Sequence, residues 1–136
     1  MAGMFVLSKD VEREQLDWGV QGWFSRPTRT GADTLVLVEV SLRPGCGHTF
    51  HYHPRQEEIV YVLTGEVEQW IETEKKTLKA GDSAFMGVGT VHASFNVSNQ
   101  PARVLAIVGP ALNVGVDGYE VIEVPDEAPW NSLRKG

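Results

Sequence analysis

The sequence predicts an all-β fold, an antiparallel sandwich or barrel with little helix. Short runs rich in Val, Leu and aromatic residues recur at regular intervals, and turns containing Gly, Pro or Asn separate them. The length of 136 residues indicates one domain over 1–136, since a chain of this size buries roughly two-thirds of its extended surface. We therefore expect one β domain with its own hydrophobic core.

Seven strands are expected in order along the chain. The first covers 34–42, where Val36, Val38, Val40 and Leu42 share one face. The others are expected at 48–53, 58–63, 66–72, 83–88, 92–97 and 102–108. Helix is expected only over 10–17, as one or two turns with Asp10 as N-cap. The polar stretch 125–136 contains two prolines and is expected to lie on the surface or to fray.

Composition excludes several classes of partner. The net charge of −6 comes from 18 acidic and 12 basic residues, which argues against nucleic acid because phosphates require a basic patch. No Lys/Arg run indicates an anionic membrane surface, and no apolar stretch approaches the ~18 residues of a membrane span. The N-terminus does not resemble a secretory signal, so a cytoplasmic location is expected. Cys46, a single cysteine, excludes an internal disulfide and a cysteine-only zinc site.

Three histidines and one glutamate form the most informative pattern. His51 and His53 are two residues apart, so their side chains share one face of a strand. Glu58 heads the next strand, and the bend at 54–57 would bring its carboxylate back toward the two rings. His92 opens a later strand after a glycine-rich turn. Three imidazoles and a carboxylate suit Zn, Cu, Fe or Ni, and Mn more weakly, whereas Ca and Mg are disfavoured.

The spacing around these residues resembles the two motifs of the cupin family. The first motif is matched by Gly45, His51, His53, Glu58 and Gly65. The second is matched by Gly81, Gly87, Gly89, His92 and Asn96, with Gly87 where the family usually has proline. The motifs cover 45–96, and the segments 1–30 and 117–136 flank this core.

The resemblance implies a small barrel of two antiparallel sheets, also described as a double-stranded β-helix or jelly roll. It implies that His51, His53, Glu58 and His92 bind one divalent transition metal, which is Fe, Mn, Ni, Zn or Cu. Small cupins are commonly dimers, so a homodimer is expected. The strand faces opposite the ligands are also apolar, which gives four interface candidates: Phe50, Tyr52, Ile59 and Tyr61.

Other polar residues near the motifs are expected to have structural or surface roles. Glu57 has the opposite strand parity from Glu58 and is expected in solvent or in a salt bridge. His48 has the opposite parity from His51 and is interpreted as a surface or interface residue. Asn96 is expected to close a hydrogen bond near the site, and Cys46 to be a spacer in its turn. Core packing is favoured for all four tryptophans: Trp18, Trp23, Trp70 and Trp130.

Two functional hypotheses remain open at this point. The first is an enzyme, of oxygenase, isomerase or lyase type, that acts on a small oxygenated organic molecule or sugar acid, with Glu58 also serving as a catalytic proton acceptor. The second is a non-catalytic module that binds or senses a small ligand and has a vestigial or adventitious metal site. A second general acid or base beside the metal ligands would favour the enzyme. A metal-independent epimerase is disfavoured, because the four-ligand set is intact.

Overall fold

The described part of the chain is built mainly from eleven strands joined by turns and loops. The computed structural model describes residues 2–113 and 118–134. The strands in the described residues are β1 (Glu12–Leu16), β2 (Gly19–Ser25), β3 (Val36–Leu42), β4 (Gly47–Tyr52), β5 (Glu57–Thr64), β6 (Glu66–Ile71), β7 (Glu74–Lys79), β8 (Ser83–Met86), β9 (His92–Phe95), β10 (Ala102–Gly109) and β11 (Ile122–Glu123). Helix is limited there to a 3-10 turn at Ser8–Asp10 and to α1 (Pro27–Thr30). Met1, 114–117 and 135–136, at the ends of the two expected flanking segments, lie outside the described residues.

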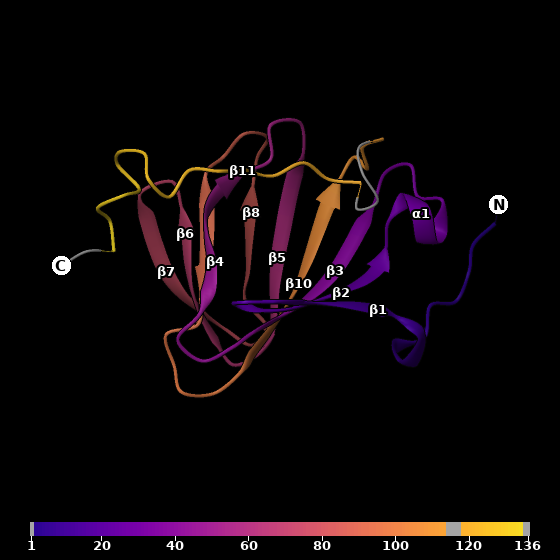
Figure 1. The fold of residues 1–136 in the computed structure, drawn as a ribbon, viewed down its shortest axis with the longest axis horizontal. Helices are drawn as coiled ribbons and strands as arrows, with labels where there is room; N and C mark the ends of the chain where they lie inside the picture. The colour runs from indigo at the N-terminus through magenta and orange to yellow at the C-terminus, as the bar shows by residue number, and fades with distance from the viewer. Residues whose placement is uncertain (1, 114–117, 135–136) are drawn as a thin grey trace.

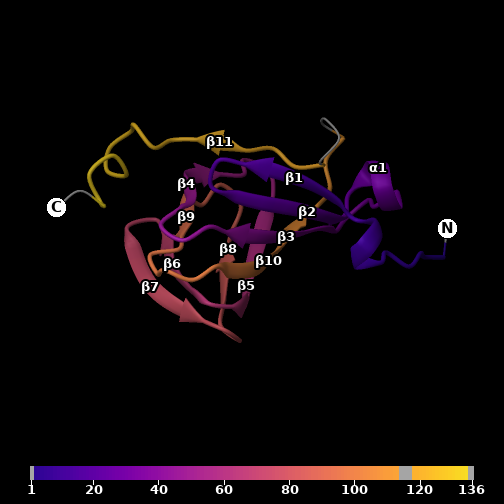
Figure 2. The same cartoon turned by 60° about the horizontal axis from the view of Figure 1, so that its bottom comes forward.

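The strands form two antiparallel sheets that face each other as a barrel (Figures 1 and 2). One sheet has the order β1-β2-β3-β10-β5-β8, and the other has the order β11-β4-β9-β6-β7. This confirms the expected antiparallel β-barrel with little helix. None of the helices in the described residues is long and apolar enough to cross a membrane.

Strand alternation places the core between the two sheets. In β3 the four residues expected to share a face, Val36, Val38, Val40 and Leu42, are all buried. In β5 the buried face carries Glu58, Val60 and Val62, and the exposed face carries Glu57, Ile59 and Tyr61. The buried valines from both strands belong to one hydrophobic cluster, whose interior opens toward Glu58. The period of two therefore aims the carboxylate inward and sends Glu57 to solvent, as predicted.

All seven expected strands are present, with ends within two residues of the predicted ones. The helix expected over 10–17 is wrong: this stretch forms the 3-10 turn and then β1, which pairs with β2 from Glu12↔Trp23 to Leu16↔Gly19. Its mostly exposed polar side chains carry no clear period, so pairing with a neighbouring strand decides the conformation. β2 and β7 were not predicted because two glycines interrupt the first and charged residues dominate the second.

Phe50 is not available as an interface residue, contrary to the sequence prediction. Its side chain is 3% exposed and packs against Trp70 and Phe95, with ring centroids 5.5 and 6.0 Å away. Trp130 and Leu133 pack against the same cluster from the polar C-terminal stretch. That stretch therefore lies on the surface, as expected, but it also covers the outer side of β4.

The chain returns to the barrel after β10 through residues 118–124, which we call the return segment. β11 pairs with β4 there, with Glu123 opposite His51 and Ile122 opposite Tyr52. The amide of Val124 also donates to the carbonyl oxygen of Phe50. In Figure 1 this part of the chain, drawn in orange to yellow, runs along one end of the barrel. The pairing brings the return segment against the strand that carries two of the predicted ligands.

Candidate metal centre

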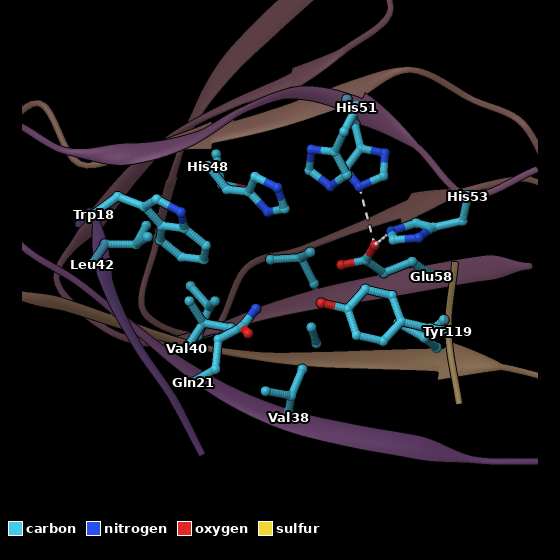
Figure 3. Close-up of a pocket in the computed structure, with 16 residues that line it drawn as sticks. Trp18, Gln21, Val38, Val40, Leu42, His48, His51, His53, Glu58 and Tyr119 are labelled. Atoms are coloured by element: carbon cyan, nitrogen blue, oxygen red, sulfur yellow. Dashed lines mark hydrogen bonds and ion pairs between the residues drawn. The ribbon is translucent and has the colours of Figure 1, made fainter. Parts of the chain in front are cut away.

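The four predicted ligands converge inside the barrel from both sheets. His51 and His92 are direct cross-strand partners in β4 and β9, and His53 follows the end of β4. Glu58 approaches from β5 in the opposite sheet. One ligand atom from each of the four side chains lies within 4.8 Å of the others, and all four residues are buried. Figure 3 shows His51, His53 and the Glu58 carboxylate turned toward one another.

Each imidazole is held in one orientation by a main-chain carbonyl group. The Nδ1 atoms donate to the carbonyl oxygens of Thr49 for His51 (2.6 Å), Glu120 for His53 (2.8 Å) and Thr90 for His92 (3.0 Å). When the proton of a neutral ring is on Nδ1, its Nε2 atom can present a lone pair to a metal ion at the centre of the cluster. Such outer partners fix the tautomer that a metal-binding histidine needs. The cluster is therefore arranged as three imidazole nitrogen donors.

The carboxylate of Glu58 completes the donor set. Its Oε1 atom lies 2.8 Å from Nε2 of His53 and 3.0 Å from Nε2 of His92. Adjacent ligands of one transition-metal ion, at about 2.1 Å from it, lie about 3 Å apart. Three imidazole nitrogens with one carboxylate oxygen are the donors that transition metals prefer. The described residues therefore fit one transition-metal ion held by His51, His53, Glu58 and His92.

The electrostatics of the buried cluster favour a cation. Burial acts to raise the pKa of Glu58, but hydrogen bonds from His53 and His92 outweigh it and hold that pKa well below its usual range. Burial, with the neighbouring His48 and His92 rings, lowers the pKa of His51 well below its usual value. Burial also acts to lower the pKa of His92, yet the hydrogen bond and charge of Glu58 raise it overall. The Glu58 carboxylate thus favours positive charge beside it, whether from a proton on His92 or from a metal ion.

The cluster borders a narrow cavity of about 50 Å³, a volume that a few water molecules fill. Seven of the sixteen lining residues are aliphatic: Val38, Val40, Leu42, Val60, Val104, Ala106 and Val108. Besides the four clustered residues, the polar or aromatic members are Trp18, Gln21, His48, Ser94 and Tyr119. Among the described residues, no Lys or Arg lines this cavity.

His48 lines the cavity and is not the surface or interface residue that strand parity predicts. Its ring stacks on His51, with centroids 3.7 Å apart and planes at 11°. The other face stacks on Trp18 at 4.8 Å, and Nε2 lies 2.9 Å from Oε1 of Glu123. The β4–β9 pairing shifts register between His48 and His51, and such an irregularity breaks the alternation on which parity relies. Trp18 is likewise a cavity residue, whereas Trp23 and Trp70 are core residues as expected.

Other expectations concern residues beside the cluster. Asn96 is fully buried, and its amide donates to the carbonyl oxygens of Leu42 and Gln100, which confirms a structural role. Cys46 is a free, half-buried thiol in its turn. Three polar or aromatic cavity residues were missed, Gln21, Ser94 and Tyr119. Gln21 is a single polar residue in the otherwise apolar run of β2, and this could have been noticed, but no sequence signal brings Tyr119 to the cluster.

Comparison with known proteins settles the family. A family model described as "Cupin domain" matches residues 38–108. The chain belongs to the cupin family. This cupin is 31% identical over 106 residues to the tetracenomycin polyketide synthase protein TcmJ of Streptomyces glaucescens, which covers 76% of this chain and 71% of TcmJ. It is 34% identical over 84 residues to the pectin degradation protein KdgF of Dickeya dadantii, covering 62% and 72% of the two chains.

The fold of this cupin also has solved counterparts. The structure of KdgF from Halomonas sp. superposes with a TM-score of 0.73 at 22% identity, over 82% of this chain and 97% of that one. At this level of identity the likeness concerns the fold alone. The expected double-stranded β-helix and the resemblance to cupins are both confirmed.

Proposed function

We propose that this cupin is a metal-dependent enzyme that transfers protons on a small carbonyl- or hydroxyl-containing molecule. The observation that carries the proposal is the buried cluster of His51, His53, Glu58 and His92 at the wall of a closely lined cavity. The resident metal is one divalent ion of Fe, Mn, Ni, Zn or Cu, which the donor set suits. When bound, such an ion supplies a Lewis acid for a carbonyl or hydroxyl oxygen.

Groups that can carry a proton lie beside the cluster, which favours an enzyme over a binding module. His48 faces the cavity with Nε2 held by Glu123 at 2.9 Å. Tyr119 also lines it, with its ring centroid 5.5 Å from that of His53. Figure 3 shows the Tyr119 hydroxyl pointing into the cavity. A module that only bound a ligand would not need general acids and bases at this position.

Glu58 keeps the second role predicted from the sequence, as a proton acceptor. Its Oε1 atom makes both imidazole contacts. Within the described residues, Oε2 takes part in no hydrogen bond, and in Figure 3 it points toward the cavity. One oxygen is thus committed to the cluster, while the other is available to a substrate proton.

The walls of the cavity favour a substrate with an apolar body and few charges. A carboxylate that did not reach the metal would be buried without a cation, at a large cost in free energy. This favours a carbonyl or enol compound over a sugar acid. The names of two relatives also point to oxygen-rich carbon compounds. TcmJ is named for polyketide synthesis and KdgF for pectin degradation.

The proposal is tested by incubating a metabolite extract with the metal-loaded protein and following each compound by mass spectrometry. The His51→Ala/His53→Ala variant and the metal-free wild type are the controls. We expect a compound that changes its retention at unchanged mass, or loses water, only with the loaded wild type. A compound that gains oxygen would contradict proton transfer. No change at all, with the metal bound stoichiometrically, would contradict an enzyme and favour the non-catalytic ligand-binding alternative.

A further inference from the structure

Gln21 faces the cavity with an amide that has no partner among the described residues. It lies on the inner face of β2 and is 7% exposed. Within the described residues, its side chain makes no hydrogen bond. Figure 3 shows the amide group turned into the cavity, toward the side on which Tyr119 places its hydroxyl.

The other buried amides of the described residues are all bonded. Gln56 donates to the carbonyl oxygens of Pro110 and Gly118 and accepts from the amide of Glu120. Gln69 accepts from the Ser94 hydroxyl, and Asn96 donates to two carbonyl oxygens. Buried polar groups are almost always paired, because leaving one unpaired costs free energy. Within the described residues, the fully enclosed side-chain nitrogen or oxygen without a partner is Nε1 of Trp130. The amide of Gln21 is instead accessible from the cavity that it lines, so its hydrogen-bonding capacity is open to a ligand there.

Among the residues that the structure describes, the surroundings of Gln21 offer its amide no partner. Its cross-strand neighbour in β3 is Val40, and Val38 and Leu42 line the same wall. β2 belongs to the six-stranded sheet, whereas the strands that carry His51 and His92 belong to the other sheet. The amide therefore approaches the cavity from the side opposite these imidazoles, where a ligand held at the cluster would present its far end.

We infer that Gln21 determines specificity by binding an uncharged oxygen of the substrate. This inference rests on the proposed function. The inference implies that the substrate has two polar ends joined by an apolar middle. One end carries the oxygens that bind the metal, and the other carries a neutral hydroxyl or carbonyl group. An amide donates and accepts, so it suits a neutral oxygen. A charged far end would call for a Lys or Arg, and the described lining of the cavity contains neither.

A first experiment measures stability without any ligand. Gln21→Leu should leave the melting temperature of the metal-free protein unchanged or raise it, because it removes an unpaired polar group. The same substitution at Gln56 is the matched control, and it should lower the melting temperature because three hydrogen bonds are lost. If Gln21→Leu destabilises the protein as much as Gln56→Leu, Gln21 is a structural residue and the inference is overturned.

A second experiment measures recognition with two probes that differ by one hydroxyl group. Kojic acid and allomaltol are flat hydroxypyranones that bind a metal through the same two oxygens, and only kojic acid carries a hydroxymethyl group at its far end. Isothermal titration of the nickel-loaded wild type should show a preference of about three- to tenfold for kojic acid, the worth of one neutral hydrogen bond. In Gln21→Leu the two affinities should be equal.

The outcomes separate the two proposals. Equal affinities in the wild type, or a preference that survives in Gln21→Leu, would overturn the role of Gln21 and leave the proposed function standing. If neither pyranone binds the nickel-loaded wild type, the metal has no position open to a chelating substrate. That result would contradict the proposed function, and with it the inference.

Discussion

Nε2 of His92 lies 3.0 Å from Oε1 of Glu58, while Nδ1 of the same ring lies 3.0 Å from the carbonyl oxygen of Thr90. Both nitrogens thus face acceptors. In the metal-free protein the two contacts are satisfied together only when the ring carries both protons, as an imidazolium. This agrees with the raised pKa of His92, in which Glu58 outweighs the effect of burial. A metal ion must displace the Nε2 proton, so metal and proton compete for one nitrogen.

This competition predicts opposite pH dependences for stability and for metal affinity. Because the pKa of His92 is raised on folding, its proton stabilises the metal-free protein fully below the unfolded value of about 6.5. That contribution is lost as pH rises through the folded pKa. Metal affinity should increase over the same range, because less proton has to be displaced.

The measurement is a pair of curves above about pH 6.5, the melting temperature of the metal-free protein and the zinc affinity from a competing chelator. The control is Glu58→Gln, which lacks the carboxylate that raises the pKa of His92. In this variant the melting temperature should fall less as pH rises. Metal affinity that does not change with pH would contradict a proton on Nε2 of His92.

Asn96 is predicted to stabilise the barrel without affecting the metal. Asn96→Ala removes two amide hydrogen bonds to main-chain carbonyls and one acceptor for the amide of Ser98. The free energy of unfolding should fall by about 2–4 kcal/mol, because buried acceptors lose their donors. Chemical denaturation checks the stability, and elemental analysis of the folded variant should still find the metal. Loss of the metal with little change in stability would place Asn96 among the metal-binding residues.

The homodimer expected from the sequence remains a prediction, and the structure suggests where it forms. Phe85, Ile59 and Ile107 are cross-strand neighbours on the outer face of the six-stranded sheet. Phe85 is 56% exposed and Ile59 is 40% exposed, so a second copy packed on this face would bury an apolar row. Light scattering of the wild type should give a mass twice the 15.0 kDa of one chain. The Phe85→Glu variant should give the mass of one chain.

The matched control for this prediction is Val97→Glu, which places the same charge at another exposed apolar residue and should leave the dimer intact. A wild-type mass of one chain would show that this face stays in solvent. Dissociation by both variants alike would mean that added charge, rather than this face, controls assembly.

The sequence was sufficient for the parts of the structure that depend on spacing. The period of two in β3 and β5 and the spacing from His51 to His92 placed the core face and the four clustered side chains correctly. It failed where the chain departs from the period or depends on distant pairing. The register shift in β4 turns His48 into the cavity. The carbonyl group that accepts from Nδ1 of His53 belongs to the main chain of Glu120, so no residue type in the sequence marks it. It reaches the site because β11 pairs with β4.

The central claim is that His51, His53, Glu58 and His92 hold one transition-metal ion, and elemental analysis tests it most directly. The protein would be purified without a tag and without added metal, beside His51→Ala/His53→Ala. His48→Ala is the control, since it removes a neighbouring imidazole that lies outside the ligand set. We predict one equivalent of a single metal in the wild type and in His48→Ala, and none in the double variant. Mixed metals below one equivalent, equal in all three proteins, would contradict the claim.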